Sequence, residues 1–531
     1  MSEPQNHPSP LHYPNANESP PNSPALTEEE KEISTVTDSE SLFNHRSGLV
    51  PYLCWVSVIS LIVAMVMFGN DLGAIAIIYV IITIFCAALS YRYPRQGLWG
   101  LLIYLPFAGT IAYWIGDDRP IFHLLKNILF YIPALLGMLV VLIREGKALI
   151  INKNLKIPLL IFLGIALINL VIVNGGQHFS DDPRGIPIVM GIFGLAILIG
   201  YIPLITCGYY LIRKNQDVYF LNRLQVVLAI VCCLLGIAQF WLVITGVCPD
   251  NSGLEPHLLL TANLQRKCLV GGSLGYLPEA NFIRLPGTFV SPWHWTWLLI
   301  SSAFFAFLTS LNDPKITWQI TGGFSLFLIM INAVISGQRT AFLGVPLVLI
   351  LLIIATSHIS RWKRLLISFL AIGLFLLTTL VIFPNLAEGR MESLTGRWTA
   401  SPPPEFVIDQ TQWTLRNSRG LLGNGLGRGT NATRSLGSTR LLETYYSKLI
   451  YELGIIGAIA FLILVTTLMT EGFKSYHQVR NSHLRNDGIV FWIFIIIIGY
   501  NPYWYPLDTD PVAVYYWLIA GVMLKLPSLT K

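Results

Sequence analysis

Arginine is the residue type in this sequence that is best suited to ligand chemistry, and it is concentrated in one region. Residues 384–447 contain seven arginines and no lysine. The planar guanidinium group can grip a phosphate or a carboxylate through two parallel hydrogen bonds, which the ammonium group of lysine cannot do. Solubility alone would accept either residue, so the bias favours an anionic ligand. Contacts with solvent or with lipid headgroups are the alternative explanation.

Arg339 lies in the short sequence Ser336-Gly337-Gln338-Arg339-Thr340, between two apolar segments with almost no loop to spare. A charged residue at that depth in a membrane costs free energy unless it is paired or faces a cavity, so a functional role is the first expectation. The alternative is an arginine at a helix end whose side chain reaches the lipid headgroups. We expect Arg339 to bind the anion.

A glycine-dense turn lies near the end of the arginine-rich region. Glycine lets backbone N–H groups approach a ligand closely, as they do in phosphate-binding nests. Such turns are common, and no strand precedes this one as a dinucleotide site would require. Because arginines flank the turn, its glycines are candidates for anion binding: Gly423, Gly425 and Gly427.

Three tryptophans open one of the apolar segments, in the sequence Ser291-Pro292-Trp293-His294-Trp295-Thr296-Trp297. Tryptophan is enriched at the level of the lipid headgroups, so an aromatic belt is the simplest interpretation. Stacking of these rings on sugars is the alternative.

The composition defines the class of protein that carries these motifs. Of 531 residues, 53% are hydrophobic and only 12% are charged, whereas a soluble protein has about 25% charged residues. The mean hydropathy is +0.60. These values exclude an ordinary soluble domain, a disordered protein and a nucleic-acid-binding protein. They predict an all-α polytopic membrane protein.

Apolar segments long enough to cross a membrane recur along the chain. We expect about 12–14 transmembrane helices, because Asn501, Pro502 and Pro506 interrupt the last pair, which could instead be re-entrant. The fourteen candidate segments are residues 50–69, 72–89, 97–115, 124–143, 157–173, 186–212, 224–246, 294–311, 316–335, 340–357, 365–383, 448–469, 488–502 and 513–525.

The segments divide the chain into four regions. Residues 1–48 are acidic and rich in Pro, Ser and Asn, which predicts a disordered cytoplasmic tail. Residues 49–383 form a transmembrane bundle with an outer loop at 247–293. Residues 384–447 form one large outer loop, and residues 448–531 form the C-terminal helices.

Basic residues set the orientation. With the N-terminus inside, twenty of the 35 Lys and Arg residues fall in cytoplasmic loops and termini. Seven of the other fifteen lie in the long loop 384–447, which the positive-inside rule exempts. The rule therefore predicts that both termini are cytoplasmic. The outer face carries twelve of the arginines and only three of the lysines.

The seven cysteines do not have the spacing of a zinc site. Five of them lie in apolar segments, where cysteine behaves as a small hydrophobic residue. Cys248 and Cys268 share an outer loop, and they could pair if that loop faces an oxidising compartment.

The order of the motifs resembles the O-antigen ligase and O-antigen polymerase superfamily. Arg284-Leu285-Pro286-Gly287-Thr288-Phe289 comes first, followed by Ser336-Gly337-Gln338-Arg339-Thr340-Ala341. The large loop with its glycine turn comes next, and then Glu443-Thr444-Tyr445-Tyr446 and Tyr451-Glu452-Leu453-Gly454-Ile455-Ile456-Gly457. The similarity covers roughly residues 280–460.

The resemblance implies a glycosyltransferase in the bacterial inner membrane that needs no metal or other cofactor. It would transfer a glycan from undecaprenyl diphosphate to an acceptor hydroxyl on the periplasmic face. The implied partners are this lipid-linked oligosaccharide and membrane lipids, with other polysaccharide-assembly proteins as further candidates and no nucleic acid. Ligases of the superfamily carry a His-Asn pair where Glu443-Thr444 stands here. A carboxylate at that point favours an O-antigen or exopolysaccharide polymerase.

The mechanism that we expect assigns a role to each candidate residue. Arg339 and Arg397 would bind the diphosphate, with Arg284 and Arg416 as second choices, and would stabilise the charge that grows on the leaving group. Glu443 would orient the acceptor hydroxyl and take its proton. The alternative for Glu443 is a structural carboxylate that balances Lys448 or a loop arginine.

A transporter of a small anion such as bicarbonate is the rival function. Transport predicts ionisable residues near the membrane midplane and interrupted helices in pairs. The sequence shows few charges within the apolar segments and no clear internal repeat, and its outer arginines gather at one face.

Overall fold

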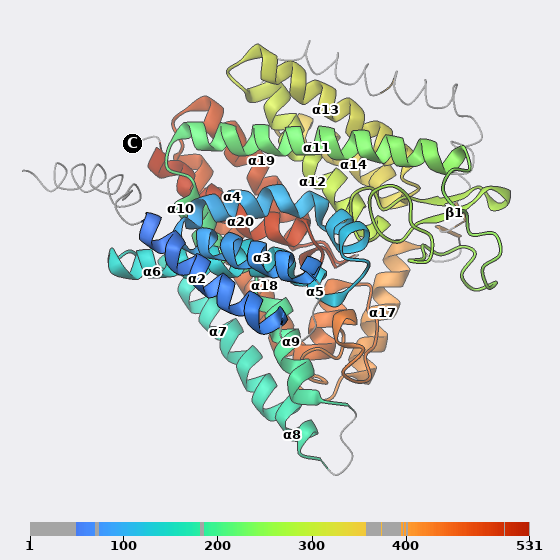
Figure 1. The fold of residues 1–531 in the computed structure, drawn as a ribbon, viewed down its shortest axis with the longest axis horizontal. Coiled ribbons are helices and arrows are strands. Elements are labelled where there is room, and N and C mark those ends of the chain that lie inside the picture. Colours follow the sequence, from blue (N-terminus) through green and yellow to red (C-terminus); the bar gives the residue numbers. More distant parts are fainter. Residues whose placement is uncertain are drawn as a thin grey trace, which may run out of the picture. The chain divides into compact units, whose positions relative to one another are not determined.

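The computed structural model describes residues 49–68, 74–180, 185–356, 402–503 and 505–529, with a few isolated positions between 373 and 399. The predicted tail 1–48, Arg397 and almost all of the expected span 365–383 lie outside the described residues. Helices make up most of the described chain (Figure 1), which confirms the predicted all-α class. The described strands are β1 (Gly275–Leu277) and β2 (Phe282–Arg284), paired antiparallel.

The α-helices follow the apolar segments of the sequence. In chain order they are α2 (Leu49–Phe68), α3 (Ala74–Arg92), α4 (Pro94–Tyr104), α5 (Pro120–Lys126), α6 (Ile132–Arg144), α7 (Lys153–Asn169), α8 (Gly175–His178), α9 (Pro187–Ile199), α10 (Leu204–Leu211), α11 (Asn215–Ile244), α12 (Pro292–Asn312), α13 (Ile316–Ile335), α14 (Arg339–Thr356), α17 (Pro403–Asn417), α18 (Tyr445–Gln478), α19 (Ser482–Gly499) and α20 (Val512–Lys525).

Ten helical segments in the described chain are long and apolar enough to cross a membrane, so this is a multi-pass membrane protein. Each corresponds to one of the expected spans. They are Ile121–Arg144, Lys153–His178, Pro187–Leu211, Asn215–Ile244, Pro292–Asn312, Ile316–Ile335, Arg339–Thr356, Tyr445–Gln478, Ser482–Gly499 and Val512–Leu529. Helices α2 and α3 match the first two expected spans, and the third, 97–115, is divided among α4, a 3-10 turn at Leu105–Phe107 and a π-helical segment at Thr110–Ile115. The total of 12–14 stays a prediction.

The chain divides into two units at residue 82, and the contacts described below lie within Ile82–Lys531. Loops that the sequence assigns to the cytoplasm contact one another through polar side chains. These pairs are Arg95 with Asp217 at 2.6 Å, Arg223 with Asp313 at 2.7 Å, Asn152 with Glu471 at 2.6 Å, and Asn312 with Asp487 at 2.8 Å. These contacts join segments that the sequence assigns to the same side, and the side itself stays a prediction.

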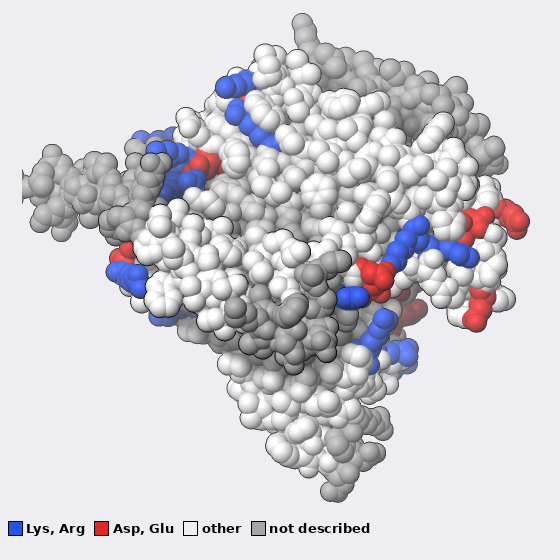
Figure 2. Space-filling view, in the orientation of Figure 1, with Lys and Arg blue, Asp and Glu red and all other residues white. Residues whose placement is uncertain are grey.

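Charged side chains are sparse between the two ends of the bundle. In Figure 2 the visible Lys, Arg, Asp and Glu side chains lie mainly toward the left and right of the view, and the surface between them is almost uncharged. Many large apolar side chains of the described chain are exposed, among them Leu167, Val171 and Trp241. An exposed apolar surface of this kind matches lipid rather than water.

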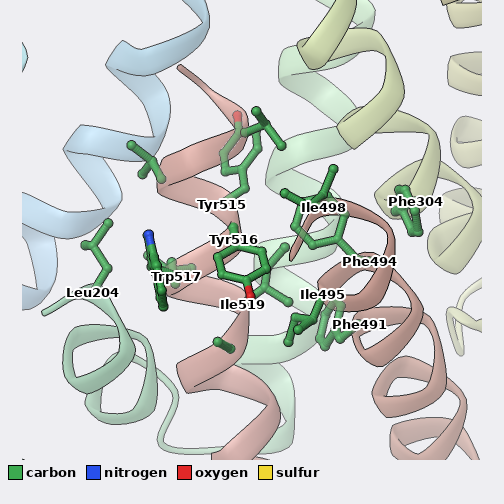
Figure 3. Packing of buried hydrophobic residues seen from close by; sticks show 14 of the residues in the cluster. Leu204, Phe304, Phe491, Phe494, Ile495, Ile498, Tyr515, Tyr516, Trp517 and Ile519 are labelled. Carbon is green, nitrogen blue, oxygen red and sulfur yellow. The ribbon is translucent and has the colours of Figure 1, made fainter. Parts of the chain in front are cut away.

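Helix α20 forms the centre of the core, and all of its residues from Val512 to Leu524 are buried. Figure 3 shows Tyr515, Tyr516 and Trp517 of this helix among Phe491, Phe494 and other apolar side chains. Glycines allow α10 and α20 to approach closely. A Cβ atom on Gly208 would lie 2.2 Å from the carbonyl oxygen of Leu518, and one on Gly521 would lie 1.9 Å from that of Ile205. Small residues at such contacts are typical of membrane helix pairs.

Two of the spans are interrupted. The segment Pro187–Leu211 turns at residues 200–203, between α9 and α10. Helix α18 breaks at Gly454, whose φ of 72° and ψ of −178° are not helical. Irregular backbone within a membrane segment has to be covered by protein or line an aqueous cavity. Both interruptions lie beside the polar residues described next.

Candidate functional site

The β-ribbon brings Arg284 to the turn that precedes Arg339. Arg284 is the last residue of β2, and the next residue, Leu285, donates its N–H to the carbonyl oxygen of Ser336 at 3.0 Å. At Gly337, with φ of 74°, a Cβ would lie 1.7 Å from the carbonyl oxygen of Ile283. Only glycine permits such a close crossing at this φ. In Figure 1 the ribbon lies beyond the right-hand end of α11.

Arg284 lies within electrostatic range of both Arg339 and Glu443. Burial lowers the pKa of the Arg284 guanidinium, the positive charge of Arg339 lowers it further, and the carboxylate of Glu443 acts in the opposite direction. The three side chains come from β2, from the start of α14 and from the segment before α18. Taken by themselves, the two guanidinium groups and the carboxylate of this trio sum to one positive charge, which suits an anionic ligand.

Tyr505 extends this group toward the loop between α19 and α20. The pKa of its phenol is raised to about 12, mainly by burial and then by the negative charges of Glu443 and Asp508. The Tyr505 ring meets the ring of Trp293 with centroids 5.9 Å apart. Tyr505 therefore connects the predicted carboxylate to the aromatic residues at the start of α12.

Two buried ion pairs fasten the same loop to the bundle. Lys448 of α18 donates to Asp508, and the lysine side chain is only 4% exposed. Lys126 of α5 donates to Asp510 at 2.5 Å and to the hydroxyl of Tyr201 at 2.7 Å. Tyr201 lies in the interruption between α9 and α10. Buried charges of this kind are expensive unless they are paired, as they are here.

Sequence reasoning missed the importance of this loop. It recognised Asn501, Pro502 and Pro506 as an interruption but assigned no role to Asp508 or Asp510. The available signal was the presence of two acidic residues, two positions apart, in an otherwise apolar C-terminal region. Which lysines they would pair with was not visible, because Lys126 is 384 residues away from Asp510.

The glycine turn does not form an open anion nest in the structure. Asn424 donates its N–H to the carbonyl oxygen of Tyr451 at 2.7 Å, and Gly425 donates to that of Glu452 at 3.1 Å. These carbonyls lie just before the break in α18, where helical partners are missing. The turn therefore fills the break, and the packing argues against the expected anion contact for its buried glycines, Gly423, Gly425 and Gly427.

Two asparagines at a π-helical turn also bind the backbone of the glycine turn. Leu426 donates its N–H to the side-chain oxygens of Asn169 at 3.2 Å and Asn174 at 2.9 Å. These asparagines are five residues apart at the π-helical segment Leu170–Asn174. Single π turns occur often at functional sites, and this one aims two amides at the same backbone donor.

Of the other two predicted arginines, only Arg416 lies in the part of the chain that the structure describes. Arg416 is exposed in the last turn of α17, and no described contact links it to Arg284, Arg339 or Glu443. Arg397 lies outside the described residues. Arg428, an arginine with no assigned role, donates to the side chain of Gln177 at 2.8 Å.

Cys248 and Cys268 form a disulfide, with Cα atoms 5.4 Å apart. Gln239 of α11 ties the disulfide loop to the segment after Arg284. Its amide donates to the carbonyl oxygens of Cys268 at 2.9 Å and Val270 at 2.6 Å, and its oxygen accepts from the N–H of Gly287 at 3.0 Å. The disulfide thus belongs to the scaffold that carries Arg284.

No protein-family model matches the chain, and no curated protein matches it either. Among the described residues, no group of three or more His, Cys, Asp or Glu side chains could hold a metal ion. The arrangement itself, two arginines and one carboxylate from three separate segments, is therefore the basis for assigning a function.

Proposed function

We propose that this chain is a membrane glycosyltransferase of the O-antigen ligase and polymerase type. It transfers a glycan from undecaprenyl diphosphate to an acceptor hydroxyl on the periplasmic face of the bacterial inner membrane, with both termini in the cytoplasm. The observation that carries the proposal is the convergence of Arg284, Arg339 and Glu443 from three separate segments. From the sequence, Arg339 is a first choice for the diphosphate, Arg284 is a second choice, and Glu443 is the choice for the acceptor hydroxyl.

The charge of the trio suits this reaction. Departure of a diphosphate leaves growing negative charge, which two guanidinium groups stabilise through charge-assisted hydrogen bonds. The acceptor hydroxyl forms the new bond to the anomeric carbon as the bond to the diphosphate oxygen breaks. Its proton passes to Glu443, which is half-buried next to the arginines. Alignment of donor and acceptor supplies the rest of the catalysis.

Glu443 favours a polymerase over a ligase. A carboxylate stands here in place of the His-Asn pair that ligases of the superfamily carry. In a polymerase, the acceptor is a second lipid-linked repeat, and the product grows by whole repeats.

The proposal is tested with the purified full-length protein in lipid nanodiscs and an undecaprenyl-diphosphate oligosaccharide from its own host. We expect a ladder of lengthened glycans on a gel, which Arg339→Ala abolishes and Arg416→Ala preserves. A single shift that requires added lipid A core would instead establish a ligase. Absence of product with both acceptors, in the presence of a donor that another transferase uses, would overturn the assignment.

Transport of a small anion such as bicarbonate is a second candidate, and one observation favours it. Each interrupted span lies beside a buried ion pair, Lys126–Asp510 at the turn between α9 and α10, and Lys448–Asp508 near the break in α18. Interrupted helices with ionisable residues are typical of transporters. Uptake of labelled bicarbonate into proteoliposomes, lost in Asp510→Asn, would support this function, whereas uptake equal to that of empty liposomes would exclude it.

A further inference from the structure

The three tryptophans at the start of α12 differ in their surroundings. Trp295 and Trp297 are almost fully buried, with exposures of 1% and 2%, so their rings belong to the core. Trp293 is half-buried. An aromatic belt at the lipid surface would require exposed rings, and two of these three rings are not exposed. Trp293 is the one whose ring has surface left for a ligand.

Trp293 is paired with a residue from the other end of the sequence. The ring of Tyr505 lies 5.9 Å from that of Trp293, with the two planes inclined at 42°. Tyr505 is also half-buried. The two rings come from the start of α12 and from the loop before α20, so they meet only in the folded protein.

The backbone of Tyr505 adopts an unusual conformation. Its φ is 29°, in the left-handed region that bulky residues rarely occupy. The loop around it maintains this conformation, since the carbonyl oxygen of Tyr505 accepts from the N–H of Asp508 at 3.2 Å and from the hydroxyl of Thr509 at 3.1 Å. Asp508 is in turn fastened to Lys448. Conformations that the surrounding structure imposes at such a cost cluster at ligand-binding sites.

The aromatic pair stands beside the carboxylate of the site. Glu443 lies within electrostatic range of both Tyr505 and Arg284. A ligand group bound on the two rings would therefore be near the residue proposed to take the acceptor proton.

A sugar ring is the ligand that fits these groups. The C–H face of a pyranose packs on aromatic rings, and the tyrosine hydroxyl and carboxylate oxygens bond to its hydroxyl groups. We propose that Trp293 and Tyr505 form a saccharide-binding subsite that holds the acceptor sugar with its reacting hydroxyl toward Glu443. This inference rests on the proposed glycosyl transfer, to which it adds the place and the chemistry of the acceptor.

The test separates sugar binding from anion binding. Full-length protein in nanodiscs is titrated with two probes, the lipid-free oligosaccharide repeat of the host and inorganic pyrophosphate. We expect Trp293→Leu and Tyr505→Leu each to weaken oligosaccharide binding about fivefold to tenfold, the loss of one aromatic contact. Pyrophosphate binding stays within about twofold. Trp241→Leu, which removes an exposed tryptophan of α11, is the matched control and leaves both affinities unchanged.

Variants that keep an aromatic ring control for misfolding. Trp293→Phe and Tyr505→Phe keep a ring and are expected to retain most of the oligosaccharide affinity. Three outcomes would overturn the subsite. The wild type could fail to bind the oligosaccharide, both leucine variants could bind it as tightly as the wild type does, or the leucine variants could lose oligosaccharide and pyrophosphate affinity equally. If the wild type binds pyrophosphate through Arg339 but does not bind the oligosaccharide at the aromatic pair, the proposed function stays intact and only the subsite is overturned. If the wild type binds neither probe, the proposed function and the subsite are both overturned.

Discussion

Arg284 and Arg339 are brought together by a crossing that depends on a single glycine. Without Gly337, strand β2 could not lie on the turn between α13 and α14, because a Cβ would collide with the carbonyl oxygen of Ile283. The two guanidinium groups oppose one another's charge, which lowers the pKa of Arg284 in addition to the effect of burial. A bound anion would reverse this effect by stabilising both charges.

A residue-level prediction concerns the shape of the anion contact. Arg339→Lys keeps the charge but loses the planar fork. We expect Arg339→Lys to weaken pyrophosphate binding about tenfold and Arg339→Ala about a hundredfold, as for charge-assisted hydrogen bonds of ~1.5–3 kcal/mol. Calorimetric titration in nanodiscs measures both. Arg416→Ala on the exposed end of α17 is the control, and a loss there as large as that of Arg339→Ala would contradict the assignment.

The role of Glu443 leads to a second residue-level prediction. Glutamine can still orient a hydroxyl but cannot take its proton, whereas aspartate can do both from a shorter side chain. We expect Glu443→Gln to lower the rate of glycan transfer about a hundredfold or more and Glu443→Asp to keep measurable activity. Pyrophosphate binding serves as the check on folding. Full transfer activity in Glu443→Gln would show that the carboxylate is not the base.

At the scale of elements, the loop between α19 and α20 is held by charges from two different spans. Lys126 reaches it from the end of α5, and Lys448 reaches it from the first turn of α18. The loop supplies Tyr505 to the site, so its attachment matters for function as well as for stability. It also explains why Asn501, Pro502 and Pro506 interrupt the apolar pattern, because regular helix there would displace Asp508 and Asp510.

Removing one partner of a buried ion pair should destabilise the protein more than replacing both partners by apolar residues. Asp510→Ala leaves Lys126 buried without its acid, which we expect to destabilise the protein by about 3–5 kcal/mol. The double variant Lys126→Met with Asp510→Leu should recover most of that loss, because two apolar side chains need no partner. Thermal unfolding in detergent compares the stability of the wild type, the single variant and the double variant. A double variant less stable than Asp510→Ala would argue against a paired arrangement.

The contact between α10 and α20 allows a test with a matched glycine. A Cβ on Gly521 would lie 1.9 Å from the carbonyl oxygen of Ile205, whereas one on Gly323 in α13 meets nothing within 4 Å. We expect Gly521→Ala to destabilise the protein by about 1–3 kcal/mol through overpacking, and Gly323→Ala to cause no loss. Unfolding midpoints measure both. Equal midpoints for the two variants would mean that the helices are not in close contact.

At the scale of the whole molecule, polar contacts group the loops as the distribution of basic residues predicts. The ion pairs Arg95–Asp217 and Arg223–Asp313 join loops assigned to the cytoplasm. The disulfide, the two arginines Arg284 and Arg339, and Glu443 lie in segments assigned to the outside. The grouping of loops comes from the structure, and the side on which each group lies comes from the positive-inside rule.

Labelling of introduced cysteines tests the orientation. Gln412→Cys on α17 and Lys147→Cys in the turn after α6 are both exposed and lie in loops assigned to opposite sides. In intact spheroplasts, we expect a membrane-impermeant maleimide to label Gln412→Cys above the background of the unsubstituted protein. Lys147→Cys should react only after permeabilisation. The reverse pattern would place both termini outside the cytoplasm.

The sequence alone was sufficient for the membrane class and for the ten spans of the described chain, because hydropathy and helix length are local properties of a segment. It also named Arg284, Arg339 and Glu443 as candidate site residues, because their motifs and order are visible along the chain, and their role stays a prediction. It left open whether Cys248 and Cys268 pair, and the structure joins them.

Only the tertiary structure decided which residues meet. The pairing of Lys126 with Asp510, and the meeting of Trp293 with Tyr505, each join positions hundreds of residues apart. The glycine turn resembled an anion nest in the sequence, yet its N–H groups fill the break in α18. A backbone donor is available to a ligand only if no protein acceptor is nearer. That depends on how the helices pack and not on the local sequence.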